Sequence, residues 1–154
     1  MQTGNYRMSG GCHCGSIRIE LELTRPPATY NPRACDCDFC RKHGAAYVSD
    51  PNGSLCIRVN DEQRLVRYRQ GLAIAEFILC GSCGVMVAAT LHAQGSQHAV
   101  CNARVLDTWT QFGAEESVSP KHLSASERTA RWQTLWFRNV SIAADCAVRS
   151  PPGQ

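Results

Sequence analysis

The sequence predicts a mainly β protein of antiparallel strands that carries zinc sites and one helix near its C-terminus. Three observations lead to this prediction. Apolar residues alternate with polar ones in short segments, cysteines recur at metal-ligand spacing, and helical periodicity appears only after residue 120. Alternation indicates half-buried strands, and grouped cysteines in a small chain indicate a metal.

The clearest predicted strand covers residues 15–23, GSIRIELEL, where apolar and polar side chains alternate. Residues 54–60, SLCIRVN, repeat this alternation after Asp50, Pro51, Asn52 and Gly53, so we expect a hairpin at that turn cluster. Other short runs lie at 45–48, 64–68, 74–79, 85–91 and 98–105. Such spacing is typical of antiparallel β proteins.

The predicted helix covers residues 124–137. Ser124 and Glu127 stand three residues apart and form a capping box, which marks the start of the helix. Its apolar stripe is expected to pack against the sheet as core and consists of Trp132, Leu135 and Trp136. Its outward face is expected to carry Arg128 and Arg131.

Length and composition predict one zinc-binding domain over residues 1–146. The chain has 154 residues, with 44% apolar and 19% charged residues, and no apolar run approaches the roughly 20 residues of a membrane helix. The Pro-rich residues 147–154 are expected to be disordered. No secretory signal is visible at the start, so we expect a cytoplasmic protein whose cysteines are metal ligands or reactive thiols rather than disulfides.

The charge does not favour nucleic acid as a partner. The formal net charge of +3 becomes zero if seven thiolates hold two zinc ions, and the basic residues are scattered along the chain. We therefore expect neither nucleic-acid nor membrane binding. Nothing in the sequence indicates an oligomeric state.

One set of cysteines, the four-cysteine cluster, combines a C-x-C pair with a distant C-x-x-C pair. Its members are Cys12, Cys14, Cys80 and Cys83. Tetrahedral zinc needs sulfurs about 3.8 Å apart, and both spacings satisfy that geometry. Four thiolates would close a structural site that joins the first strand to a hairpin in the middle of the chain.

A second set, the three-cysteine cluster, consists of Cys35, Cys37 and Cys40. Three protein ligands with an open position are the pattern of a chemically active zinc. Alternatives stay open: a fourth ligand from His43, Cys56 or Cys101, a Cys37–Cys40 disulfide, or an iron–sulfur cluster. The single cysteines Cys56, Cys101 and Cys146 are expected to be small buried hydrophobes.

The segments GCHCGSIRIE, CDCDFCRKHGA, FILCGSCG and NARVLD, within residues 8–110, resemble the glutathione-dependent formaldehyde-activating enzyme family, which includes centromere protein V-like proteins. The resemblance implies a β-tent fold with a structural zinc on the four-cysteine cluster and a second zinc on the three-cysteine cluster. It also implies glutathione as co-substrate. The activity implied joins glutathione to formaldehyde as S-hydroxymethylglutathione, the reverse of a carbon–sulfur lyase reaction.

The expected chemistry is attack of a thiolate, held by the second zinc, on an aldehyde carbonyl. The oxyanion that forms needs a proton or a cation, and Lys42 is the candidate catalytic residue beside the three cysteines. Arg41 and His43 are further candidates, for the oxyanion or for binding glutathione. The carboxylates of glutathione also require basic residues at a pocket, for which the candidates are Arg33, Arg67 and Arg104.

Two other functions remain possible from the sequence. The chain could be a zinc-stabilised binding module without catalysis, or a thiol or metal buffer. A second metal site with three protein ligands in an open pocket would favour the enzyme, whereas a closed site with four ligands would favour the binding module.

Overall fold

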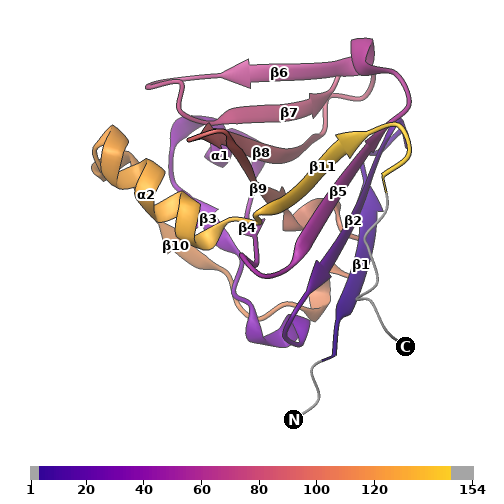
Figure 1. Ribbon diagram of the computed structural model, residues 1–154, viewed down its shortest axis with the longest axis horizontal. Coiled ribbons are helices and arrows are strands. Elements are labelled where there is room, and N and C mark those ends of the chain that lie inside the picture. The colour runs from indigo at the N-terminus through magenta and orange to yellow at the C-terminus, as the bar shows by residue number, and fades with distance from the viewer. Residues whose placement is uncertain (1–3, 147–154) are drawn as a thin grey trace.

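The computed structural model describes residues 4–146 and shows the predicted mainly β fold, with its strands arranged in two sheets. One sheet has four strands in the order β1-β2-β5-β11, and the other has seven in the order β10-β3-β4-β9-β8-β7-β6. Figure 1 shows the two sheets inclined to each other, with helix α2 beside the β3 and β10 end of the larger sheet. This arrangement agrees with the expected β-tent of antiparallel sheets and a C-terminal helix.

The strands and helices have the following bounds. The four-stranded sheet contains β1 (Tyr6–Gly11), β2 (Ile17–Leu23), β5 (Ser54–Val59) and β11 (Asn139–Ala143). The seven-stranded sheet contains β3 (Arg33–Cys35), β4 (Tyr47–Val48), β6 (Leu65–Arg69), β7 (Glu76–Cys80), β8 (Met86–Ala93), β9 (Ser96–Asn102) and β10 (Glu116–Val118). The α-helices are α1 (Asp38–His43) and α2 (Ala125–Leu135). Short 3-10 turns cover Pro27–Thr29, Glu62–Arg64, Ala103–Val105, Trp109–Gln111 and Pro120–His122.

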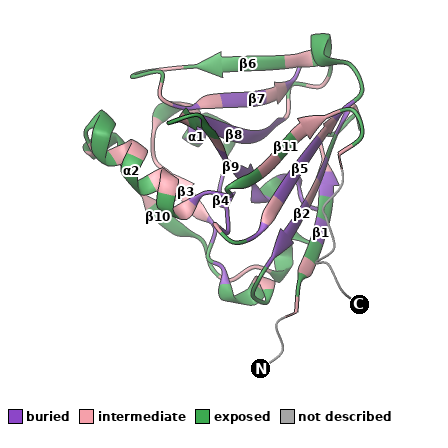
Figure 2. Ribbon diagram, viewed as in Figure 1, coloured by how far each residue is buried: buried purple, intermediate pink, exposed green. Residues whose placement is uncertain are grey.

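The core lies between the two sheets. The alternating residues of β2 face it, as predicted, and Ile17 and Leu21 have no exposed surface. Ile78 of β7 packs into the same core from the other sheet. In Figure 2 the buried residues accordingly run along β2 and β5, whereas β6 at the sheet edge is largely exposed. Burial of these side chains is the main source of stability for a fold with so little helix.

The hairpin predicted at residues 50–53 is wrong. This segment leaves β4 in the seven-stranded sheet and enters β5 in the four-stranded sheet, so it joins the sheets. Its carboxylate, from Asp50, accepts hydrogen bonds from the Thr24 amide and hydroxyl at 2.8 and 2.6 Å and from the Tyr30 hydroxyl at 2.6 Å. The turn is real, but long-range hydrogen bonds to another connection direct the strands into different sheets.

Strand pairing is antiparallel except at two edges. β10 runs parallel to β3, and β11 runs parallel to β5. Helix α2 lies between β10 and β11 in the chain, and it begins as predicted, with the Ser124 hydroxyl accepting a hydrogen bond from the Glu127 amide at 3.2 Å. The chain thus returns to the four-stranded sheet only at its C-terminal end.

A disulfide joins Cys56 and Cys146, which corrects the expectation that both are unpaired small hydrophobes and that the chain has no disulfides. Cys56 lies on β5, and Cys146 follows β11, so the parallel pairing of these strands brings the two residues to a Cα–Cα distance of 5.9 Å. The third single cysteine, Cys101, is fully buried and free, as predicted. Residues 147–154, expected to be disordered, lie outside the described residues. Among residues 4–146 no helix is long and apolar enough to cross a membrane.

Candidate metal and substrate site

The four-cysteine cluster lies where the two sheets meet. Cys12 and Cys14 stand in the turn between β1 and β2, while Cys80 ends β7 and Cys83 lies in the following turn. The Cys14 sulfur is 3.7 Å from that of Cys12 and 3.6 Å from that of Cys80, and all four sulfurs lie within 4.8 Å of one another. These separations match the edges of a zinc–thiolate tetrahedron. The donor set therefore fits a closed metal site that links the sheets.

Backbone amides point at the sulfurs of this cluster. The Ile17 amide donates to Cys12 Sγ at 3.2 Å, and the Cys83 amide donates to Cys80 Sγ at 3.4 Å. Hydrogen bonds from Ser16 lower the pKa of the Cys14 thiol to about 6, although burial raises the pKa of Cys12 to about 11. Amide donors of this kind stabilise thiolate ligands and fix their direction.

The three-cysteine cluster is built by the end of β3 and the start of α1. Cys35 is the last residue of β3, Cys37 precedes the first turn of α1, and Cys40 lies within that helix. The Cys37 sulfur caps the helix by accepting a hydrogen bond from the Cys40 amide at 3.4 Å, and Gly44 ends it in the left-handed region at φ 60°. The short helix thereby gathers three sulfurs within 4.8 Å of one another.

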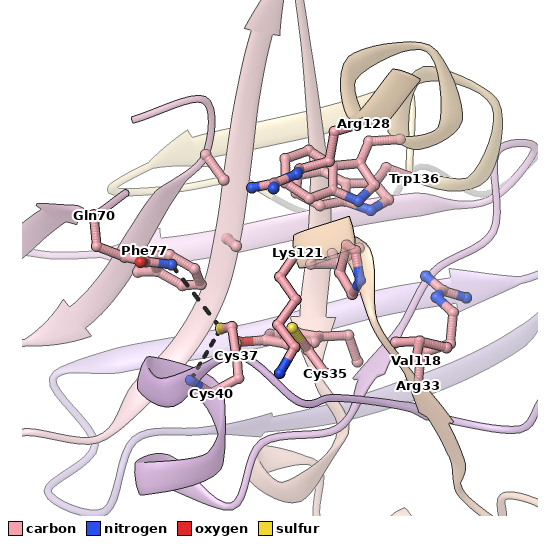
Figure 3. A pocket seen from close by; sticks show the side chains of 16 residues that line it. Arg33, Cys35, Cys37, Cys40, Gln70, Phe77, Val118, Lys121, Arg128 and Trp136 are labelled. Carbon is pink, nitrogen blue, oxygen red and sulfur yellow. Dashed lines mark hydrogen bonds between the residues drawn. The ribbon is translucent and has the colours of Figure 1, made fainter. Parts of the chain in front are cut away.

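Two polar side chains that the sequence analysis did not identify touch these sulfurs. The Tyr47 hydroxyl lies 3.1 Å from Cys40 Sγ. Gln70 Nε2 lies 3.9 Å from Cys37 Sγ, a contact drawn as a dashed line in Figure 3. The hydrogen bond with Cys40 lowers the pKa of Cys35 to about 6, whereas the same contact and then burial raise the pKa of Cys40. Tyr47 is an ordinary strand residue in sequence, and Gln70 comes from a distant loop, so no local signal marks either one.

The described part of the chain brings no fourth protein ligand to this cluster. Among residues 4–146 the metal-ligating group contains Cys35, Cys37 and Cys40 alone, and all three are free thiols. Of the alternative fourth ligands, Cys56 is in the disulfide, Cys101 is in the core between the sheets, and His43 is exposed on α1. The cluster thus fits a metal with one position left for another ligand.

A cavity of about 90 Å³ lies against the three-cysteine cluster (Figure 3). Its cationic residues are Arg33, Lys121 and Arg128, and its aromatic residues, apart from Tyr47, are Phe77, Trp132 and Trp136. Within the described chain, no carboxylate lines it. A second cavity of about 250 Å³ adjoins it, shares Arg33 and Trp132, and adds Arg131. Such a site favours an anionic ligand.

Arg33 stands between the two cavities. It lies two residues before Cys35 on β3, so both side chains are on the same face of that strand. Its Nη2 donates to the Ser49 hydroxyl at 2.6 Å, which in turn donates to the Leu135 carbonyl at 2.7 Å. Burial, and then the neighbouring charge of Arg131, lower the pKa of Arg33. Among residues 4–146 no carboxylate lies within ion-pair distance of its guanidinium, so this charge is available to a ligand.

Arg128 also lines the cavity, which corrects its predicted outward position. Arg128 and Trp132 are four residues apart, so both lie on the face of α2 that covers the cavity, and Trp136, which directly follows the helix, lines the cavity with them. Arg128 Nη2 donates to the Leu123 carbonyl at 3.3 Å, and its buried Nε has no partner in the described chain. Lys121 reaches down toward the cysteines in Figure 3, with its Nζ 3.5 Å from Asp36 Oδ2.

The basic residues next to the three cysteines in sequence lie elsewhere. Arg41, Lys42 and His43 are exposed in the last turn of α1, and none of them lines the cavity, so the roles expected of them stay predictions. Of the arginines considered for glutathione carboxylates, Arg67 is paired with Glu76 at 2.8 Å, and Arg104 is paired with Glu115. Only Arg33 of those three lines the cavity.

Comparison with known proteins agrees with this geometry. The model of the family described as glutathione-dependent formaldehyde-activating enzyme matches residues 7–122. The chain belongs to this family. It is also similar to a Rhodobacter sphaeroides protein of known crystal structure, with a TM-score of 0.51 and 28% identity over 66% of this chain and 89% of that one. The resemblance seen in the sequence is confirmed.

The matched range contains all seven cysteines of the two clusters as well as Arg33 and Lys121, so both clusters lie in the part of the chain that the family model covers. It ends before α2 begins at Ala125. Arg128, Trp132 and Trp136 are therefore contributed to the cavity by a segment outside the family match.

Proposed function

We propose that the protein is a zinc-dependent enzyme of the carbon–sulfur lyase type that joins glutathione to formaldehyde, giving S-hydroxymethylglutathione. One observation carries the proposal: a three-cysteine cluster opens onto a cavity that contains three cationic side chains and, within the described chain, no carboxylate. We propose zinc on both clusters, one ion structural and the other at the reaction site. The open position favours an enzyme over a binding module with a closed site.

In this proposal the three cysteines bind the zinc ion that would hold the reacting thiol in place. Zinc bound by Cys35, Cys37 and Cys40 would supply the positive charge that keeps an incoming thiol ionised at neutral pH. Tyr47 contacts the sulfur of Cys40, and Gln70 contacts the sulfur of Cys37. These contacts restrict the rotation of the two cysteine side chains. Three thiolate ligands donate much negative charge to the zinc ion, which makes it a poor Lewis acid. The site therefore suits the binding of a thiol better than the activation of water.

The cationic residues suit the two carboxylates of glutathione. Arg33 offers a guanidinium that no carboxylate of residues 4–146 pairs with, and Arg131 lies in the adjoining cavity of about 250 Å³, where a tripeptide has room to extend. A guanidinium binds a carboxylate through two parallel hydrogen bonds, which orients the ligand as well as attracting it. The sulfur of glutathione would then point at the three-cysteine cluster.

Lys121 is the residue of this proposal that meets the developing oxyanion. When the sulfur attacks the carbonyl carbon, the carbon–sulfur bond forms and the carbonyl electron pair moves to oxygen, which needs a proton. Lys121 points toward the cysteines and reaches across the cavity from the 3-10 turn before α2. Lys42 was the sequence candidate for this role, but its exposed position on α1 supports it less well.

Exchange NMR with formaldehyde and glutathione tests the proposal. We expect the wild-type protein to exchange free and glutathione-bound formaldehyde faster than the uncatalysed reaction, and Cys37→Ser to lose about 100-fold or more of this acceleration. Cys101→Ala is the matched control, since that thiol lies in the core away from the cavity, and it should retain the rate. A wild-type protein that holds two metal ions per chain and still exchanges at the uncatalysed rate would refute the proposed activity.

A further inference from the structure

The cavity beside the three-cysteine cluster has an apolar wall, which we define as Phe77, Trp132 and Trp136. Phe77 and Trp136 keep only 7% and 5% of their surface exposed, and Ala89 and Val100 line the same side. The two tryptophan rings stack with their centroids 4.7 Å apart and an angle of 20° between their planes. Aromatic rings held in this way form a rigid surface that a flat or linear hydrocarbon can cover.

Formaldehyde has no use for such a wall, because it carries no hydrocarbon group beyond its carbonyl carbon. Glutathione does not need it either, since its polar ends suit the cationic residues. Figure 3 shows Arg33 on one side of the cysteines and Phe77 on the other, so a thiol anchored at Arg33 leaves the Phe77 side of the cavity free for the second reactant. The wall also includes the two tryptophans that lie beyond the family match.

We infer that this cavity binds the hydrocarbon chain of an aldehyde larger than formaldehyde. This inference rests on the proposed function and widens its substrate class. A dry cavity of roughly 150 Å³ is known to accept benzene, so the volume of about 90 Å³ here suits a straight chain of about three or four carbons. The preferred second substrate is therefore a short aliphatic aldehyde such as propanal or butanal.

With the larger aldehyde the same bonds form and break, and the same protons move, as with formaldehyde. The thiol proton leaves to solvent, the sulfur–carbon bond forms, and the carbonyl π pair moves to oxygen, which takes a proton from Lys121. Solvent then returns a proton to Lys121. The sum is a thiol plus an aldehyde giving a hemithioacetal, with no oxidant or reductant.

The first test measures kcat/KM with glutathione and a series of formaldehyde, acetaldehyde, propanal and butanal, referred to the free carbonyl form and corrected for the uncatalysed reaction. Each added methylene should raise kcat/KM about fourfold, because it is buried against the apolar wall. Trp132→Ala should flatten this series. Trp109→Phe, an exposed tryptophan that does not line the cavity, should keep the slope. A flat or falling series in the wild type overturns the inference.

The second test does not depend on turnover. In the Trp109→Phe protein the remaining tryptophans are Trp132 and Trp136, so their fluorescence reports on the apolar wall. Butyramide should shift this fluorescence at concentrations at least tenfold below those that formamide needs, and equal responses overturn the inference. If formaldehyde reacts and butanal does not, the inference fails while the proposed function stands. If no aldehyde is accelerated, the proposed function fails, and the preference for butyramide alone decides whether the wall binds a hydrocarbon chain.

Discussion

The two cysteine clusters use the same ligand atoms in opposite structural ways. The four-cysteine cluster joins segments 66 residues apart, between Cys14 and Cys80, and connects the two sheets. The three-cysteine cluster spans six residues of one connection and closes no long loop. A metal in the first cluster therefore restricts the unfolded chain strongly, whereas a metal in the second restricts it little.

Their surroundings differ in the same sense. A tetrahedral metal in the four-cysteine cluster would have all four coordination positions filled by protein sulfurs, so no position would remain for a substrate. The three-cysteine cluster has a cavity on its open side, and three cationic side chains line that cavity. The number of sulfurs and the length of the loop they close therefore separate a site suited to holding the fold from a site suited to binding a further ligand.

The largest expected effect is on the fold and comes from Cys80→Ser. Structural zinc sites contribute about 10 to 16 kcal/mol of binding free energy, as much as the whole stability of a typical domain, so we expect this variant to lose one metal ion and its cooperative unfolding transition. Cys101→Ala removes a buried thiol outside both clusters and should cost only about 1 kcal/mol. Metal content and thermal unfolding followed by circular dichroism measure both. A Cys80→Ser protein that melts like the wild type would show that this cluster does not hold the sheets together.

The next effect concerns the Cys56–Cys146 disulfide, the cross-link that involves no metal ligand. It closes a sequence separation of 90 residues, so the double variant Cys56→Ala, Cys146→Ala should lose about 2 to 4 kcal/mol of unfolding free energy. Both metal ions should remain bound, since neither cysteine belongs to a cluster. Denaturant unfolding with and without a reductant measures the loss. Reductant should destabilise the wild type and leave the double variant unchanged, and a wild type insensitive to reductant would contradict the disulfide's contribution.

Local patterns predicted those parts of the molecule that depend on neighbouring residues. The alternation in residues 15–23 identified β2, the Ser124 and Glu127 pair identified the start of α2, and the cysteine spacings identified both clusters. In each case the residues that form the feature lie close together in sequence or share a ligand geometry.

Features that depend on distant contacts were missed. The turn at Asp50 was predicted to form a hairpin, because its hydrogen bonds to Thr24 and Tyr30 cannot be read from the turn itself. The disulfide depends on the parallel pairing of β5 with β11, and helix α1 is too short for periodicity to reveal it. Lys121 and Arg128 reach the cavity only because the segment around α2 folds over it. Basic residues beside the cysteines in sequence were therefore a poor guide to the cations beside the cysteines in space.

The smallest expected effect is on substrate affinity and comes from Arg33→Lys. Lysine keeps the charge but not the planar pair of donors, so the KM for glutathione should rise about tenfold, a loss of about 1.4 kcal/mol, while kcat changes little. Loss of the hydrogen bond to Ser49 should cost about 1 kcal/mol of stability at most. Arg67→Lys is the matched control, because that arginine is paired with Glu76 outside the cavity, and it should leave KM unchanged.

Steady-state kinetics with glutathione varied at saturating aldehyde separate the two parameters, KM and kcat. A fall in kcat at constant KM would place Arg33 at the reacting atoms rather than at the carboxylate. Equal effects in both variants would remove Arg33 from the site and leave Lys121, Arg128 and Arg131 as the cations that distinguish the open cluster from the closed one.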